Sequence, residues 1–192
     1  MSIECDSCRG TVPAFDTVHY GSTDTGYRDL CSRCFNRELA ASGNIEFQHI
    51  GFPPLEMTDA AGRSHRFQCR VHLLGDRVSL EAFELKAGAP GGYQFEILGD
   101  ADADLFGLMG QLMIRMRRAL AMRHLERDEH AGFAMKDSVV RGRVNWDSEQ
   151  DGRLPMLVID GQDVSWEKLG RMVMSFEGWQ FKLQMMDRSE EA

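Results

Sequence analysis

The chain has 192 residues, of which 43% are hydrophobic and 27% are charged, an ordinary composition for a folded globular protein. Its net charge of −8 disfavours non-specific binding to nucleic acids unless basic groups gather on one face. The first residues lack the apolar stretch of a secretory signal, and no apolar run of about 18 residues occurs anywhere in the sequence. We therefore expect a cytoplasmic protein that does not associate with a membrane.

Cys5, Cys8, Cys31 and Cys34 form two Cys-x-x-Cys pairs that are separated by 22 residues. In a chain without an export signal, such pairs favour metal binding or catalysis over disulfides. The two sulfurs of each pair can reach one ion, and four thiolates complete the closed tetrahedral shell that zinc prefers. We therefore expect one structural Zn²⁺ on these cysteines. A dithiol redox site, rubredoxin-like iron and unrelated buried cysteines are the alternatives.

The residues around the two pairs suit a metal site. Gly10 follows the first pair, where a glycine relieves the steric cost of a tight turn. The second pair opens a helix predicted over residues 32–41, whose free N–H groups stabilise negative sulfur. Arg9, Arg33 and Arg37 can offset the negative charge of a centre with four thiolates.

A domain boundary is predicted near residues 42–44, where Gly43 is placed to cap the end of the first helix. Few large aliphatic residues precede Ile45, whereas the periodicity of a packed core follows it. The prediction is a zinc-binding module over residues 1–44 and an α+β domain over residues 45–192. A module of this size has too little core to fold alone, so we expect its metal to stabilise it.

The order of these features, a CxxC turn, an intervening hairpin and a second CxxC at a helix start, resembles treble-clef zinc fingers. Residues 27–35, Tyr-Arg-Asp-Leu-Cys-Ser-Arg-Cys-Phe, resemble the closing segment of ZZ-type fingers, which bind peptides. The resemblance covers residues 5–35 and implies the four cysteine ligands only, because the ligands of the second zinc of ZZ domains are missing between Cys8 and Cys31. Residues 154–183 are similar to uncharacterised bacterial proteins that carry zinc fingers, which implies no activity.

Alternating apolar residues predict a sheet in the second quarter of the chain. In residues 66–73, Phe67, Cys69, Val71 and Leu73 share one face of a half-buried strand. The next strand, over residues 78–85, changes the parity of its apolar positions, which indicates a β-bulge near Ala82. A third strand is predicted over residues 93–97, and residues 55–58 are expected to add an edge strand.

Apolar residues then recur at helical spacing from Asp104 to about Asp128, with Asp102 or Asp104 as the N-cap. The final third predicts strands over residues 140–146 and 154–160, a helix capped by Asp163, and a last strand over residues 179–185. The expected fold class is therefore α+β, with a largely antiparallel sheet, a long helix of about 25 residues and a shorter helix near the C-terminus.

Other residue clusters have ordinary structural explanations beside their functional ones. His65 and His72 are placed on the outward face of their strand, where they meet solvent and Glu81 or Glu84, or line a cleft between sheet and helix. Cys69 is expected to be a core residue. The five arginines between residues 115 and 127 form the one concentrated basic stretch, namely Arg115, Arg117, Arg118, Arg123 and Arg127.

The leading functional hypothesis is a bacterial zinc-binding accessory or protein-interaction protein with an unidentified protein partner, because no catalytic motif occurs in the sequence. The first alternative is nucleic-acid binding through the finger and the Arg115–Arg127 helix, which the net charge disfavours. The second is an enzyme of unidentified class with a site between sheet and helix. We assign no catalytic and no cofactor-binding residues.

Overall fold

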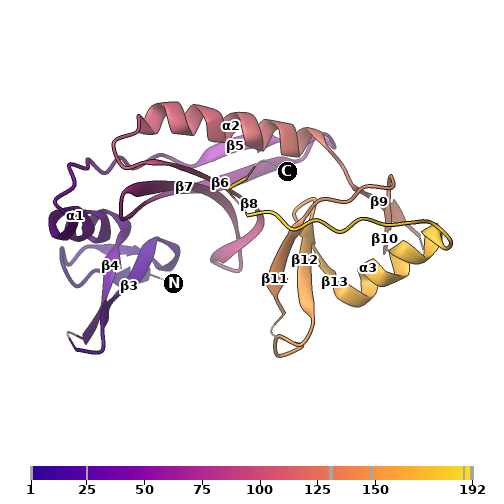
Figure 1. Cartoon of the computed structure of the whole chain (residues 1–192), viewed down its shortest axis with the longest axis horizontal. Helices are drawn as coiled ribbons and strands as arrows, with labels where there is room; N and C mark the ends of the chain where they lie inside the picture. Colours follow the sequence, from indigo (N-terminus) through magenta and orange to yellow (C-terminus); the bar gives the residue numbers. More distant parts are fainter. Residues whose placement is uncertain (1, 25, 130–131, 148, 188, 191–192) are drawn as a thin grey trace.

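The computed structural model describes residues 2–24, 26–129, 132–147, 149–187 and 189–190. Every strand pair within these residues is antiparallel, and the strands alternate along the chain with three α-helices. The predicted α+β class with largely antiparallel sheets is confirmed. Figure 1 shows a curved sheet with one helix above it and two smaller units below its ends.

The N-terminal unit contains two small hairpins and one helix. Its elements are β1 (Ser2–Glu4), β2 (Thr11–Pro13), the 3-10 turn η1 (Ala14–Asp16), β3 (Thr17–Ser22), β4 (Gly26–Cys31) and α1 (Ser32–Gly43). Three of the four cysteines are buried together with Leu30 and Phe35 in a core of few residues. The predicted cap at Gly43 is wrong by one residue, because Asn44 takes the left-handed conformation with φ of 50°.

The central unit is a four-stranded sheet in the order β5-β6-β7-β8. Its strands are β5 (Leu55–Thr58), β6 (Ser64–Leu74), β7 (Arg77–Lys86) and β8 (Ala89–Asp100). The four predicted strands are therefore confirmed, and the bulge lies between Phe83 and Glu84, close to the predicted Ala82. Because side chains alternate along a strand, one face of this sheet is apolar and the other carries most of its polar groups.

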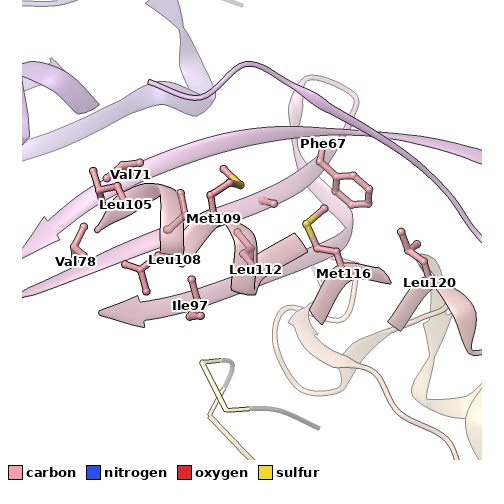
Figure 2. Close-up of a cluster of buried hydrophobic side chains, with 12 residues drawn as sticks. Phe67, Val71, Val78, Ile97, Leu105, Leu108, Met109, Leu112, Met116 and Leu120 are labelled. Carbon is pink, nitrogen blue, oxygen red and sulfur yellow. The ribbon is translucent and has the colours of Figure 1, made fainter. Parts of the chain in front are cut away.

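Helix α2 (Leu105–Ala121) packs on the apolar face of the sheet. Figure 2 shows its inward side chains in a row among Phe67 and Val71 of β6, Val78 of β7 and Ile97 of β8, and these helix side chains are Leu105, Leu108, Met109, Leu112, Met116 and Leu120. Asp104 caps the helix by accepting the N–H groups of Phe106 and Gly107, as predicted. Among the described residues, no helix has both the length and the apolar content to span a membrane.

The predicted extent of this helix is wrong, because α2 has 17 residues and ends at Ala121. The buried Asp160 carboxylate accepts the N–H groups of both His124 and Leu125 at 2.8 Å. These two bonds hold the chain in a non-helical path, and residues 125–128 form a strand. A contact with a residue 35 positions away therefore overrides the local helical periodicity.

The C-terminal unit has a hairpin of β9 (Leu125–Asp128) and β10 (Gly132–Met135) and a sheet of β11 (Arg143–Trp146), β12 (Pro155–Ile159) and β13 (Gln162–Ser165). Helix α3 (Trp166–Val173) and the turn η2 (Met174–Phe176) follow. Two predicted strands and the shorter helix are confirmed. The cap of α3 is Ser165, whose hydroxyl accepts the Lys168 N–H, and not Asp163 as expected.

Residues 178–187, which we name the C-terminal strap, do not form the predicted strand. They contain no regular structure, and Trp179, Phe181, Leu183 and Met185 are all exposed instead of facing a core. The strap is held at both ends: the Trp179 N–H donates to the Phe176 carbonyl, and Arg115 of α2 binds the Ser189 carbonyl. In Figure 1 the strap runs in yellow from the end of α3 back toward β8.

The side chain of Asn36, which is 0% exposed, is one of the contacts that attach the N-terminal unit to the sheet, together with the bond from Arg70 to the Phe15 carbonyl. The Asn36 amide donates to the Val71 carbonyl and accepts the Leu73 N–H, both at 2.8 Å, on the free edge of β6. The amide therefore makes the two bonds that a neighbouring strand would make. Beside it, Ser32 bonds to His72 on the polar face of the sheet.

Candidate metal centre

The four predicted cysteines come from the two turns that face each other in the N-terminal unit. Cys5 and Cys8 lie in the turn between β1 and β2, Cys31 ends β4, and Cys34 lies in the first turn of α1. Their sulfur atoms all lie within 4.8 Å of one another. Four sulfurs at about 2.3 Å from one tetrahedral ion would be about 3.8 Å apart, so the arrangement is close to that of a closed metal site.

The turn that carries the first pair is stabilised by its own backbone. The Cys5 N–H donates to the Gly10 carbonyl at 2.9 Å, and the Arg9 N–H donates to the Cys5 carbonyl at 2.8 Å. Arg9 takes the left-handed conformation, with φ of 59°, whereas Gly10 does not. The predicted role of Gly10 is therefore wrong, and the strained position of the turn is Arg9.

The electrostatic surroundings of the sulfurs favour thiolate at one position. Burial raises the pKa of Cys5, but N–H groups of Cys8, Cys31 and Ser7 lower it to about 6. The Cys31 N–H lies 3.3 Å from the Cys5 sulfur. Burial and the neighbouring sulfurs raise the pKa of Cys31 to about 12. A bound metal cation would balance the negative charge of the other three cysteines when they are also thiolates.

Arg37 is the basic residue that contacts the centre. Its guanidinium donates to the Cys34 sulfur at 3.6 Å and to the Ser7 hydroxyl at 3.0 Å. Arg9, which was expected to act in the same way, lies 3.5 Å from Glu4 and 3.9 Å from Asp6 and forms surface ion pairs. Of the three predicted arginines, Arg37 therefore compensates the sulfur charge directly.

All five cysteines are free thiols, and the fifth lies apart from the other four. Cys69 packs against the main core on β6, as expected, and burial raises its pKa to about 11. Within the described ranges, the four N-terminal cysteines are the one group of His, Cys, Asp and Glu residues that can hold a metal ion. Their donor set is compatible with zinc.

The two histidines of β6 do not converge on one site, because they lie on opposite faces of the strand. His65 shares the parity of Phe67 and Val71 and is buried on the side of α2, so its predicted outward position is wrong. His72 lies on the other face, with its ring 5.5 Å from that of Phe35. The hypothesis of a catalytic cleft that contains both rings has no support from this geometry.

His65 lies between two carboxylates at the end of the sheet. Its Nδ1 is 2.7 Å from Glu84 Oε1, and its Nε2 is 3.2 Å from Asp59 Oδ2, without the angle of a hydrogen bond. Burial raises the pKa of Asp59, but bonds from the Arg63 side chain and from the N–H groups of Arg63 and Ala61 hold it well below its usual range. The Tyr93 N–H binds the second oxygen of Glu84. The histidine is thus a structural link between the side chains of Glu84 and Asp59.

We expect replacement of His65 by Gln to destabilise the protein by about 1–3 kcal/mol, because it removes the ring that bonds to the largely buried Glu84 carboxylate. Urea unfolding of the zinc-loaded protein measures this change. Arg66→Ala is the matched control, since its exposed side chain is the next one along β6 and such substitutions stay within about 0.5 kcal/mol. Equal losses in both variants would refute the structural role of His65.

His72 contributes to the pH dependence of folding. Burial and the nearby Arg70 lower its pKa from 6.5 to about 4, and burial lowers the pKa of His49 in the same direction. As the pH falls below 6.5, the unfolded chain binds a proton at His72 that the folded chain does not bind. The free energy of unfolding is therefore complete above pH 6.5 and decreases toward pH 4.

We expect His72→Gln to flatten this decrease, since Gln can keep a bond to Ser32 and does not titrate. The change is at most about 1.4 kcal/mol per pH unit. It is measured by urea unfolding at several pH values between 5 and 7.5 with zinc in excess. Gln68→Ala, on the same face of β6, is the control that should keep the wild-type slope, and an unchanged slope in His72→Gln would contradict the assignment.

The predicted basic helix is divided by the structure. Arg115 lies on α2 and donates to the Glu96 carbonyl of β8 and to the Ser189 carbonyl, so it is used within the fold. Arg123 and Arg127 lie beyond the end of α2, and Arg127 is part of β9. Arg117 and Arg118 remain on exposed positions of the helix. The region from Arg115 to Arg127 is therefore not one continuous basic helix. Nucleic-acid binding by this region stays a prediction.

The structure adds a surface that the sequence did not reveal, at the end of the β3–β4 hairpin. A hollow of about 400 Å³ is lined there by Tyr20, Gly21, Ser22, Gly26 and Arg28. Gly21 has φ of 152°, and a Cβ at this position would lie 2.0 Å from the Gly26 carbonyl oxygen, so only glycine fits. No motif marks these residues, and only the glycine spacing of the hairpin could have indicated the hollow.

Exposed aromatic groups lie on the opposite face of the same hairpin, since His19, Tyr27 and Asp29 alternate with the residues that line the hollow. Tyr27 stacks on the ring of His19, with centroids 4.9 Å apart and an interplanar angle of 9°. His19 is held in turn by Asp29, at 2.9 Å from its carboxylate. The hairpin therefore presents a fixed aromatic platform to solvent.

Comparison with known proteins gives three consecutive matches to families of domains of unknown function. DUF7685 matches residues 4–45, DUF7686 matches residues 48–121 and DUF7713 matches residues 124–190. Neither the search of curated proteins nor the search of solved structures found a match to the chain. The chain is thus similar over most of its length to domains without a described activity, and its first domain match contains all four clustered cysteines.

Proposed function

We propose that this chain is a zinc-binding protein-interaction or accessory protein, in which residues 1–44 form a structural, treble-clef-like zinc module. The observation that carries the proposal is the convergence of the four cysteine sulfurs within 4.8 Å. Their order along the chain, a turn between two short strands, then a hairpin, then a helix start, supports the treble-clef interpretation. One Zn²⁺ held by Cys5, Cys8, Cys31 and Cys34 closes the site, and a closed shell of four thiolates is typical of structural zinc.

The proposed role of the metal is to hold the β3–β4 hairpin in place for a partner. The module has a core of few side chains, and this core is formed largely by the cysteines themselves. Small units of this kind depend on a metal for their fold. Side chains outside this core can then contact a partner, because the fold of the module does not depend on them.

The partner we propose is a protein segment that binds at the hairpin. One face of the hairpin carries the hollow of about 400 Å³, which has the size of a pocket for one or two side chains, and the other face presents Tyr27, which is 54% exposed. Exposed tyrosine is enriched in protein interfaces, where its ring contributes area and its hydroxyl a hydrogen bond. The resemblance to ZZ-type fingers, which bind peptides, agrees with this choice.

A peptide library displayed on phage, selected on the zinc-loaded full chain, tests the proposal. We expect selected peptides to lose binding both in Tyr27→Ala and after removal of zinc with a chelator. Trp166→Ala is the control, because Trp166 is an exposed aromatic residue on α3, outside the module. Selection of no peptide with both dependences, or equal loss in Trp166→Ala, would reject the hairpin as the binding surface.

A further inference from the structure

The C-terminal strap has the sequence pattern of a β-strand, but it pairs with no other strand among the described residues. Trp179, Phe181, Leu183 and Met185 alternate with Gln180, Lys182 and Gln184, which is the pattern of a strand with one apolar face. The four apolar side chains are 69%, 89%, 67% and 68% exposed. Exposed apolar side chains in an alternating row indicate a surface that another polypeptide covers.

The backbone of the strap is also available. Its ends are fixed by the Trp179 bond to Phe176 and by the Arg115 bond to Ser189. Between these anchors, none of the described residues forms a backbone ladder with residues 180–186. The strap therefore offers a row of N–H and C=O groups to a strand that approaches from outside.

A matching edge lies on the same unit. Strand β11 is an outer strand of the β11-β12-β13 sheet, and its Val144 and Trp146 are 52% and 73% exposed. These residues are two positions apart and so share one face of the strand. Trp146 is held over Gly152 of the following turn, where a Cβ would lie 2.0 Å from the indole ring. The edge thus combines open backbone groups with a fixed exposed apolar patch.

We propose that the strap of one molecule adds as a strand to the β11 edge of a second copy of this chain, and that the second copy does the same in return. The argument for a second copy is self-complementarity, because the chain carries both the unpaired strand and the open apolar edge. A reciprocal exchange gives an interface with twofold symmetry that closes on itself. The family match over residues 124–190 includes both β11 and the strap, so the two features belong to one unit.

The area available is sufficient for a stable dimer. Each copy contributes six exposed apolar side chains, of which Trp179, Phe181 and Trp146 are aromatic and can bury roughly 150–250 Å² each, while Leu183, Met185 and Val144 add further area. Two copies therefore reach the roughly 1,600 Å² that is typical of a stable protein interface. Lys182, Gln180 and Gln184 would lie on the opposite side of the added strand and remain in solvent.

Sedimentation velocity and light scattering of the zinc-loaded full chain test the proposal. We expect a dimer, and we expect Phe181→Asp to raise its dissociation constant by about 30-fold or more, since an interface aromatic residue contributes about 2 kcal/mol. Because Phe181 is exposed in the single chain, this variant should keep its circular dichroism spectrum. Lys182→Ala is the matched control and should leave the dissociation constant unchanged.

Two further variants identify the pairing strand and the partner. Leu183→Pro removes an N–H from the strap, and Trp146→Ser changes the opposite side of the interface, so both should weaken the dimer. A cysteine pair, Lys182→Cys with Asn145→Cys, should form disulfides between chains. A monomer at about 100 µM, a dimer insensitive to Phe181→Asp, or disulfides formed within single chains would overturn the proposal.

Discussion

Removing the metal is expected to unfold residues 1–44 while the central sheet keeps its structure. Binding of structural zinc to small finger domains is worth about 10–16 kcal/mol in apparent terms, which exceeds what the small N-terminal core can supply. The variant Cys31→Ser should give the same result, because Cys31 is both a sulfur donor and the N-cap of α1. Hydrogen exchange should then show loss of protection from β1 to α1 and retained protection in β6, β7 and β8.

The fifth cysteine provides the control for this experiment. Cys69→Ser changes a thiol that lies outside the cluster, so this variant and the wild type should both retain about one zinc ion per chain by elemental analysis. Cys31→Ser should retain little or none. Stoichiometric iron, or no metal in freshly purified and reduced wild-type protein, would contradict the zinc assignment.

The second large effect is expected from Asn36→Ala. This change removes the amide that binds the Val71 carbonyl and the Leu73 N–H, and it leaves two buried backbone groups without partners. Each such group costs about 1–3 kcal/mol, so we expect a loss of about 2–6 kcal/mol in the free energy of unfolding. Urea unfolding with zinc in excess measures this loss and keeps the metal site saturated.

A substitution on the same helix separates this effect from a change of helix stability. Ser42→Ala removes an exposed hydroxyl that donates to the Leu39 carbonyl, and it should change the free energy by no more than about 0.5 kcal/mol. Metal content should be equal in both variants. If Asn36→Ala unfolds at the same urea concentration as Ser42→Ala, the amide does not attach the module to the sheet.

The predictable parts of this fold are those in which sequence spacing and geometry coincide. The alternation of Phe67, Val71 and Leu73 defines β6, and the CxxC spacing identifies the sulfur cluster, because both depend on residues that are close in sequence. The same alternation also places His65 inward, since it is two positions before Phe67. The outward position predicted for His65 is therefore inconsistent with the sequence pattern itself.

Other features depend on partners that are distant in sequence. The end of α2 is fixed by Asp160, and the position of the N-terminal unit depends in part on Asn36, which resembles any polar residue of a helix until β6 is placed beside it. The strap shows the reverse case. Residues 179–185 have a clear strand pattern, but a strand also requires a neighbour, and the single chain does not provide one.

In the proposed zinc-bound state, the bond between Asn36 and β6 keeps part of the sheet edge covered. Once the N-terminal unit melts, the amide leaves, and the backbone of β6 near Val71 and Leu73 becomes an open sheet margin. Such a margin can recruit further molecules into growing cross-strand assemblies. Loss of the metal would thus make the protein prone to aggregation and to recognition by chaperones and proteases. Bound zinc would prevent this by keeping the sheet edge covered.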